Sequence, residues 1–330
     1  MTSVAYTVCS HTNPEQVARL VSVISADDRG SSVVVHHDDS RSRLDARALR
    51  ERFGVNVLRS DESVEWGAFS VVEMVLRCMR WALETLQFEW LVLLSGQDYP
   101  IRPLRAIEES LASSEFDGFL SGRTVEALKP RSAREARRRY QYRYYRLPTP
   151  RRLVVAGLSA RHRTRSGGHR QTGEMNGAED TSPISIRAVP DGSALYVGVP
   201  RRHTPFGPSF QCFRGSGWFT LSIKSVRAVD RFIDEHPEYV RFYRRTWVPD
   251  ESFFNTILLN DPELNISTDD RRYVRFPPEG APHPDVLAID DLEPMLASGK
   301  DFARKFDTRI DSAILDALDE RVHGIRQSIT

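Results

Sequence analysis

Two short segments carry side chains suited to acid–base and anion-binding chemistry. Glu251 follows Trp247 and Pro249 at the expected start of a helix, among apolar neighbours. Arg304 and Lys305 form an adjacent pair of cations near the carboxyl terminus. A carboxylate can take a proton from a hydroxyl, and a guanidinium beside an ammonium can hold phosphate oxygens. Together these groups suit the displacement of a phosphate leaving group by an alcohol.

Each of these segments also has a simpler interpretation. Asp250 and Glu251 can merely cap a helix, because acidic groups favour the first turn. The cation pair flanked by Phe302 and Phe306 can lie on a hydrophobic wall, but it can equally be a solvated surface feature. The order of the other motifs therefore decides between the catalytic and the structural interpretation of these two segments.

Two aspartates follow expected strands, where ligands of α/β sheets usually bind. Asp38 follows the strand 32–36, and Asp98 follows the buried strand 90–94. Asp38 and its neighbour Asp39 are the one cluster with hard-metal potential at such a place, but adjacent carboxylates point apart in an extended chain. We expect a nucleotide contact or a structural role for Asp38, and no metal site. Asp98 can accept hydrogen bonds from ligand hydroxyls or belong to an ordinary turn.

Two tryptophans next to glycines can contact a ligand or pack in the core. Trp66 precedes Gly67, which leaves space beside the indole, and a helix begins nearby. Gly217 and Trp218 offer backbone amides and an aromatic face on which a sugar-like ring can stack. Both interpretations remain open for each tryptophan.

The elements that must position these residues alternate between strand and helix in the first part of the chain. Because strands that alternate with helices usually form a parallel sheet covered on both faces, we expect an α/β fold with a mostly parallel sheet flanked by helices. We expect one large domain over residues 1–330. The expected strands are 4–9, 32–36, 55–58 and 90–94, and the expected helices are 14–24, 44–53, 70–86 and about 250–259.

The region at about 129–205 breaks this pattern and is Arg-rich. We expect a helix near 132–145 followed by a long mobile loop, an insertion into the domain. Arginines and tyrosines interleave over 131–146, which makes a single-stranded nucleic-acid binder the alternative function. A lid or an acceptor-binding edge is the favoured use, because the chain as a whole is nearly neutral, with 46 basic and 45 acidic side chains. We expect no nucleic-acid partner.

Composition restricts the remaining function classes. The chain has 330 residues, enough to bury a core, and only three cysteines, which are widely separated. No signal stretch or membrane-spanning window is present, so the expectation is a soluble cytoplasmic protein without an integral membrane segment. Motifs of dehydrogenases, phosphate-loop NTPases and nucleophile-elbow hydrolases are missing from the sequence.

Seven segments in a fixed order resemble one family, the core 2 branching β-1,6-N-acetylglucosaminyltransferases and protein O-xylosyltransferases, in a bacterial-looking version without an anchor. Each segment is weak by itself, but their joint order is specific. They cover nearly the whole chain apart from about 128–208. The segments are Ala5 to Leu20, Val33 to Ser40, Trp66 to Ser70, Leu94 to Ile101, Gly215 to Phe219, Pro249 to Phe254 and Phe302 to Phe306.

This resemblance implies a GT-A fold and an inverting transfer of a sugar, of the GlcNAc or xylose class, from a UDP-sugar to an acceptor hydroxyl. It implies no cofactor and no divalent metal. Glu251 falls on the family's catalytic base, and Arg304 and Lys305 fall on its diphosphate contacts. The other implied donor-side positions are Asp38, Trp66, Asp98 and Arg272, and Gly217 and Trp218 are taken for the acceptor side.

Two departures from the family pattern concern the acceptor. Phe276 replaces the tryptophan that usually follows the Arg272-Tyr273 segment, and the disulfides of the animal enzymes are absent. The sequence leaves the sugar, the acceptor, the linkage and the oligomeric state open.

Overall fold

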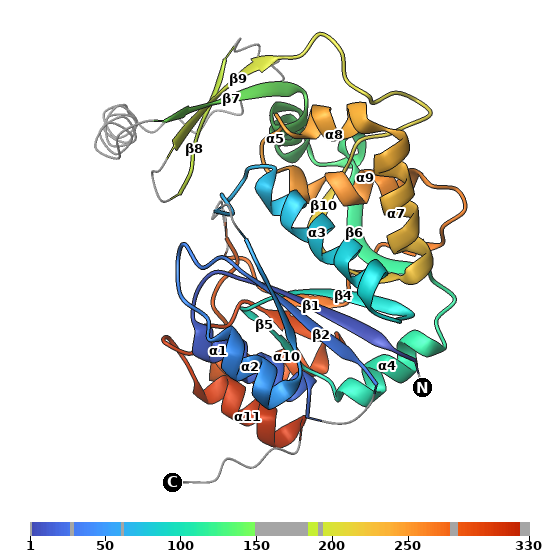
Figure 1. Cartoon of the computed structure of the whole chain (residues 1–330). Coiled ribbons are helices and arrows are strands. Elements are labelled where there is room, and N and C mark those ends of the chain that lie inside the picture. The colour runs from blue at the N-terminus through green and yellow to red at the C-terminus, as the bar shows by residue number, and fades with distance from the viewer. Residues whose placement is uncertain are drawn as a thin grey trace.

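A seven-stranded mixed sheet forms the centre of the molecule (Figure 1). The computed structural model describes residues 2–26, 30–60, 63–148, 184–190, 194–277 and 283–323. Strand order is β11-β6-β10-β4-β1-β2-β3, and β10 runs antiparallel to both of its neighbours while the other pairs are parallel. The strands are β1 (Val4–Ser10), β2 (Ser32–His37), β3 (Asn56–Arg59), β4 (Trp90–Ser95), β6 (Gly118–Thr124), β10 (Phe213–Ser222) and β11 (Ile266–Ser267).

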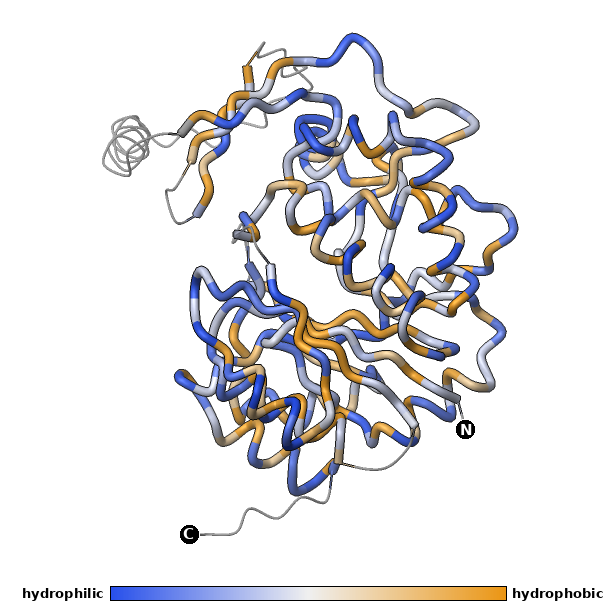
Figure 2. The backbone as a smooth tube through the Cα atoms, in the orientation of Figure 1, coloured by the Kyte–Doolittle hydropathy of each residue, from blue (hydrophilic) through white to orange (hydrophobic). Residues whose placement is uncertain are grey.

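Helices cover both faces of this sheet, each over its own apolar cluster. Side chains alternate along β1: Tyr6 and Val8 enter one cluster, and Ala5 and Cys9 enter the other, as the two-residue period of a strand requires. The first cluster is covered by α1 (Pro14–Ile24), α2 (Ala46–Phe53), α4 (Leu104–Ala112), α10 (Leu292–Ala297) and α11 (Ala313–Arg321). The second is covered by α3 (Ser70–Thr85), α7 (Ile223–Glu235), α8 (Pro237–Tyr243) and α9 (Phe253–Asn260). Figure 2 shows the hydrophobic strands running between these layers.

The expected α/β fold with a mostly parallel sheet flanked by helices is confirmed. Expected and observed bounds in the first hundred residues agree within two residues, because apolar periodicity determines them. The three cysteines are free and buried. Among the described residues, no helix has both the length and the hydrophobicity needed to span a bilayer.

A small sheet connects the end of β4 to the carboxyl-terminal part of the chain. It consists of β12 (Arg272–Val274), β13 (Phe302–Arg304) and β5 (Asp98–Pro100), in that order. In its register Arg304 lies opposite Asp98. Two sequence motifs that are about two hundred residues apart are therefore neighbours through backbone pairing.

A third sheet projects from the body of the molecule beside α5 (Pro130–Tyr140) (Figure 1). Its strands are β7 (Tyr142–Pro148), β9 (Ala194–Pro200) and β8 (Ser185–Ala188), in that order. The expectation of a helix through residue 145 followed by a loop was wrong here, because the helix ends at Tyr140 and a strand follows. Residues 149–183 of the expected Arg-rich insertion lie outside the described residues. The remaining elements are the 3-10 turns Val125–Ala127, Pro249–Glu251 and Ile289–Asp291.

Candidate active site

The Arg304–Lys305 pair lies at the carboxyl end of the parallel strands, where β13, the central strand of the small sheet, ends. Arg304 Nε is 3.3 Å from Asp98 Oδ1, and the Arg304 guanidinium lies 4.3 Å from the centre of the Trp218 ring. Phe302 and Phe306 on either side of the pair are fully buried, so the expected hydrophobic wall is present. These contacts hold the guanidinium in place between a carboxylate and an indole.

Lys305 is the less constrained member of the pair. Partial burial, followed by the neighbouring charge of Arg304, lowers the pKa of the Lys305 ammonium. Burial and the same ammonium lower the pKa of His283, whose ring lies 5.6 Å from that of Trp66. Lys305 and Trp66 therefore border one region, although they are far apart in sequence.

Asp98 works mainly as an anchor inside the turn that follows β4. Its side chain is 1% exposed and accepts hydrogen bonds from the Ser95 amide at 2.8 Å and the Ser95 hydroxyl at 2.7 Å. Asp98 also forms an ion pair with Arg304. The structure thus places Asp98 beneath the cation pair as the group that orients Arg304. A direct contact of Asp98 with a donor stays a prediction.

Asp38 organises the loops at the end of β2. It accepts hydrogen bonds from the Ser40 hydroxyl at 2.6 Å, the Ser40 amide at 3.0 Å and the Val64 amide at 2.8 Å. Burial alone would raise the pKa of Asp38, but these hydrogen bonds outweigh burial and lower the pKa. Asp38 and Lys305 both act electrostatically on His11, so Asp38 borders the same end of the sheet as the cation pair.

Glu251 lies in the 3-10 turn Pro249–Glu251, immediately before α9. The helix α9 thus begins at Phe253, three residues later than the expected start at about residue 250. Glu251 Oε2 accepts a hydrogen bond from Arg139 Nη1 at 2.6 Å and lies 3.4 Å from Arg214 Nε. The side chain is 30% exposed. Within the described residues, Oε1 has no hydrogen-bond partner, so one carboxylate oxygen is held and the other is available.

The sequence did not indicate Arg139 or Arg214 as a partner of Glu251: Arg139 counted only as part of the Arg/Tyr-rich segment 131–146, and Arg214 was not considered. Arg139 is in the last turn of α5, where it also donates to Glu135 Oε1 at 3.0 Å. Arg187 of β8 donates to the other oxygen of Glu135 at 2.9 Å. The only sequence signal was the Glu135/Arg139 spacing of four residues on a helix, which does not point to Glu251.

Asp250, next to the candidate base, has an unusual environment. Burial, followed by the nearby charge of Glu251, raises the pKa of Asp250 to about 7. Its Oδ2 lies 3.1 Å from the position that a β-carbon on Gly217 would occupy. Arg139 and Arg304 both oppose the pKa shift. Asp250 thus interacts electrostatically with both Glu251 and Arg304, on the two sides of the site.

The Gly217–Trp218 segment joins these two sides. The β10–β6 register shifts between Gly215 and Phe219, and such a bulge re-aims side chains at a sheet. Gly217 packs against Asp250, and Trp218 packs against Arg304. Glu251 and the cation pair therefore flank one bulge of β10, a juxtaposition that the sequence order alone does not contain.

Trp66 is 37% exposed and packs edge-on against Trp247, with ring centres 5.6 Å apart. Gly67 has a φ of 78°, and a β-carbon there would come within 3.1 Å of the Trp247 ring. The space left by this glycine is therefore filled by Trp247. Trp66 combines the two interpretations from the sequence, with one edge packed and the rest open.

Arg272 lies in the core, away from the exposed face of the cation pair. Its side chain donates to the backbone carbonyls of Leu93 at 3.0 Å and Phe219 at 2.9 Å, and to that of Asp270. Burial lowers the pKa of Arg272. These bonds connect β4, β10 and β12, so the observed role of this residue is to hold the two sheets together. Its expected contact with phosphates stays a prediction.

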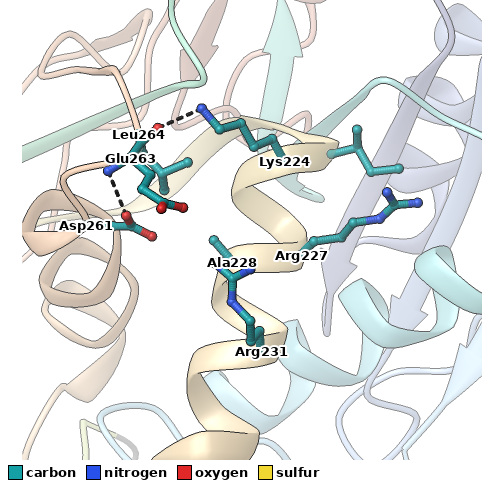
Figure 3. A pocket seen from close by; sticks show the side chains of 8 residues that line it. Lys224, Arg227, Ala228, Arg231, Asp261, Glu263 and Leu264 are labelled. Carbon is teal, nitrogen blue, oxygen red and sulfur yellow. Dashed lines mark hydrogen bonds between the residues drawn. The ribbon is translucent and has the colours of Figure 1, made fainter.

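A surface pocket of about 280 Å³ lies elsewhere, between the start of α7 and the loop after α9 (Figure 3). Lys224 partly closes it by bonding to the Glu263 carbonyl at 2.6 Å and to Asp117 at 2.9 Å. It contains none of the residues named above, and we attach no function to it. Within the described ranges, no group of three or more metal-ligating side chains occurs.

The amino-terminal half of the chain matches a known family. Residues 4–151 match the model of the Core-2/I-Branching enzyme family. The expected resemblance is thereby confirmed for this part, while Glu251, Arg304 and Lys305 lie outside the matched range.

Curated relatives extend the comparison. β-Glucuronosyltransferase GlcAT14B of Arabidopsis thaliana is 33% identical over 127 residues, which cover 36% of this chain and 28% of the relative. Xylosyltransferase oxt of Drosophila pseudoobscura pseudoobscura is 24% identical, over 94% of this chain and 32% of the relative. The chain thus spans about a third or less of the relatives it matches.

Solved structures resemble the chain more remotely. A nucleoside-diphosphate-sugar pyrophosphorylase of Vibrio cholerae RC9 aligns over 80% of this chain and 89% of its own, with 9% identity and a TM-score of 0.34. TarS of S. aureus aligns over 36% of this chain and 21% of its own, with 13% identity and a TM-score of 0.27.

Proposed function

We propose that the protein is an inverting glycosyltransferase of the GT-A type that transfers a sugar from a UDP-sugar to an acceptor hydroxyl. The family match and the glucuronosyl- and xylosyltransferase relatives support the class. One observation carries the residue roles: Glu251 and the Arg304–Lys305 pair flank the same bulge of β10, through Asp250 and Trp218. A base and a cationic leaving-group site are thus brought to one place.

In this mechanism Glu251 is the general base. Arg139 and Arg214 hold Oε2, which leaves Oε1 to accept the proton of the acceptor hydroxyl. As that proton moves to Oε1, the acceptor oxygen bonds to the anomeric carbon and the bond from this carbon to the diphosphate oxygen breaks. Attack opposite the leaving group inverts the configuration.

The negative charge that develops on the diphosphate needs a fixed counter-charge. We assign this role to Arg304 and Lys305, and propose that they make a divalent metal unnecessary. Arg304 is pre-positioned by Asp98 and Trp218, so little reorganisation is needed when charge develops. The commitment of Asp38 to Ser40 and Val64 is consistent with a loop-organising role for Asp38 rather than a metal-binding role.

The donor class follows from the relatives and from the family resemblance: GlcNAc, xylose or glucuronic acid on UDP. A hydroxyl-bearing acceptor approaches over Gly217 and Trp218, with Trp66 bordering the donor. A cytoplasmic location without an integral membrane segment remains part of the proposal. The alternative of a nucleic-acid binder is weakened, because Tyr140 and Tyr144 of the Arg/Tyr-rich segment are buried and cannot stack on bases, which leaves Tyr145 as its one large exposed tyrosine among the described residues.

The decisive experiment is a panel of UDP-sugars tested for thermal stabilisation and for slow hydrolysis, each with and without a chelator. One UDP-sugar should raise the melting temperature and release UDP, because a ligand that binds the folded state stabilises it. The sugar released at the first time points should have the inverted anomeric configuration by NMR, and the rate should survive the chelator. Retained configuration, or a chelator-sensitive rate restored by manganese, would refute the mechanism.

A further inference from the structure

The registers of the projecting sheet β7-β9-β8 divide its side chains between an inner and an outer face. The inner face packs on the body, where Tyr144 lies against Trp247 and donates to Ser185. Arg146 and Tyr196 both bond to Glu65 on the body. These side chains of the inner face are therefore engaged in contacts with the body.

The outer face exposes a continuous apolar surface. Tyr145, Val197 and Ile186 are directly opposite one another on the three neighbouring strands, and Val199 extends the same side of β9. Tyr145 is 43% exposed, Ile186 46% and Val199 38%. Large apolar side chains this close together on a surface are typical of an interaction site. We call these four residues the outer face.

Two arginines border the outer face. The guanidinium carbons of Arg143 and Arg245 lie 5.8 Å and 5.2 Å from the centre of the Tyr145 ring. Arg201 is already engaged, because it donates to the backbone carbonyls of Tyr142 at 3.0 Å, Phe242 at 2.8 Å and Arg245 at 2.8 Å. Within the described part of the chain, neither Arg143 nor Arg245 forms an ion pair with a carboxylate. The cluster therefore keeps a local surplus of positive charge, although the chain as a whole is close to neutral.

This combination restricts what can cover the outer face. A second copy docked through the same face would bring the two arginine clusters together, and like charges at a desolvated contact are costly. A nucleic acid would gain little from Val197, Val199 and Ile186, because aliphatic side chains do not stack on bases as aromatic rings do. A partner with anionic groups at its surface and apolar groups beneath them would interact favourably with both the arginines and the apolar residues of the outer face.

We propose that the outer face docks on an anionic lipid bilayer. The apolar residues enter the boundary between head groups and acyl chains, and Arg143 and Arg245 lie among the lipid phosphates. The sheet can do this because it projects from the body of the molecule (Figure 1). The proposal does not depend on the transfer reaction, since it concerns the side of the sheet that faces away from Glu251.

The test is co-sedimentation of the full chain with phosphatidylcholine vesicles, with and without phosphatidylglycerol, at low and high salt. The wild type should bind the anionic vesicles and leave the neutral ones almost free. Arg143→Gln with Arg245→Gln should lower the partition coefficient roughly 30-fold, as expected for two cations near an anionic surface. Ile186→Ser with Val199→Ser should lower it about tenfold through lost apolar burial.

Matched controls come from the opposite end of the molecule and from α7. Ile310→Ser removes a more exposed apolar side chain, and Arg231→Gln removes an exposed cation, so both should bind like the wild type. Circular dichroism should verify that every variant is folded.

Three results would overturn the proposal. The first is a wild type that does not bind anionic vesicles at low salt. The second is binding that is lost with the arginines but unchanged by Ile186→Ser and Val199→Ser, which would mean charge attraction without docking. The third is a dimer in light scattering, or a complex with single-stranded nucleic acid, that those serine substitutions abolish. Loss of catalytic activity plays no part in this readout.

Discussion

The cation side and the base side of the candidate site are held in contrasting ways. Arg304 belongs to a strand of the buried small sheet and is fixed by Asp98 and the Trp218 ring. Glu251 is held by Arg139, whose other partner Glu135 is bound in turn by Arg187 of the projecting sheet. The first arrangement is local and packed, whereas the second is a chain of partly exposed ion pairs.

This contrast matches what the two sides have to do. A diphosphate is the same in every donor of one class, so its binding groups can be rigid and buried. An acceptor differs from enzyme to enzyme, and its recognition elements lie on more variable segments. Partly exposed ion pairs are screened by salt and rearrange easily, while a buried pair does not. Breaking the two sides separately should therefore give different kinetic signatures.

The largest effect is expected for Glu251→Gln. The amide cannot take a proton, so turnover should fall about 10²- to 10⁴-fold while UDP affinity stays within a few-fold. Steady-state kinetics and calorimetric titration with UDP measure the two quantities. Glu84→Gln on the exposed side of α3 is the control. Near-normal turnover of Glu251→Gln would remove this residue from the mechanism.

Arg304→Ala should come next, with about a 10²-fold loss of kcat/KM and weaker UDP binding, because the leaving diphosphate loses a fixed cation. Lys305→Ala should act in the same direction but more weakly. Arg309→Ala, a neighbouring exposed arginine paired with Asp307, is the matched control. Unchanged UDP affinity in both Arg304→Ala and Lys305→Ala would reject the cation side of the comparison.

Arg139→Gln should have an effect of about tenfold, in kcat rather than in donor KM, because this arginine orients the base and is on the other side of the site from the diphosphate. Arg139→Lys should restore part of the rate, while Arg137→Gln on the exposed side of α5 should change nothing. High salt should lower the kcat of the wild type toward that of Arg139→Gln. An equal loss in donor binding would contradict the separation of the two sides.

The last prediction, for Asp250→Asn, concerns stability rather than rate. The folded state holds the Asp250 proton up to a pKa of about 7, while the unfolded chain releases it near an ordinary aspartate pKa, so the free energy of unfolding falls as pH rises from about 4 to about 7 and stays low above pH 7. The neutral amide should therefore stabilise the protein at pH 8, by about 1–3 kcal/mol after allowing for partial exposure, and hardly at pH 4. Thermal melts across pH measure this. Asp290→Asn on the surface should show no such trend, and an equal shift at both pH values would refute the assignment.

Of the elements around the cation side, those up to Ser95 could be predicted from the sequence because their signals are local, whereas the strands β5, β12 and β13 were not predicted. Apolar periodicity gave the strands and helices up to Ser95, and the Ser95–Asp98 turn directly follows a buried strand. The base side could not be predicted in the same way. Strand β7 exists because it pairs with β9, some fifty residues later, and the Arg/Tyr alternation of β7 resembles a polar helix until that partner is known.

The contacts of Glu251 show the same limit. Arg139 is separated from Glu251 by 112 residues, and the sequence around it contains three consecutive arginines with no feature that distinguishes one from another. Only the packing of α5 against the turn before α9 selects Arg139. In the same way, the contact between Gly217 and Asp250 depends on a bulge of β10 that no residue pattern predicts.

Glu65 connects the two regions compared above. The Glu65 carboxylate accepts hydrogen bonds from Arg146 and from the Tyr196 hydroxyl, both on the projecting sheet. The next residue along the chain is Trp66. Any tilt of that sheet must pull on the backbone that carries the indole. A load applied to the outermost strands would thus reach Trp66 both through Glu65 and through Trp247, without passing through Glu251.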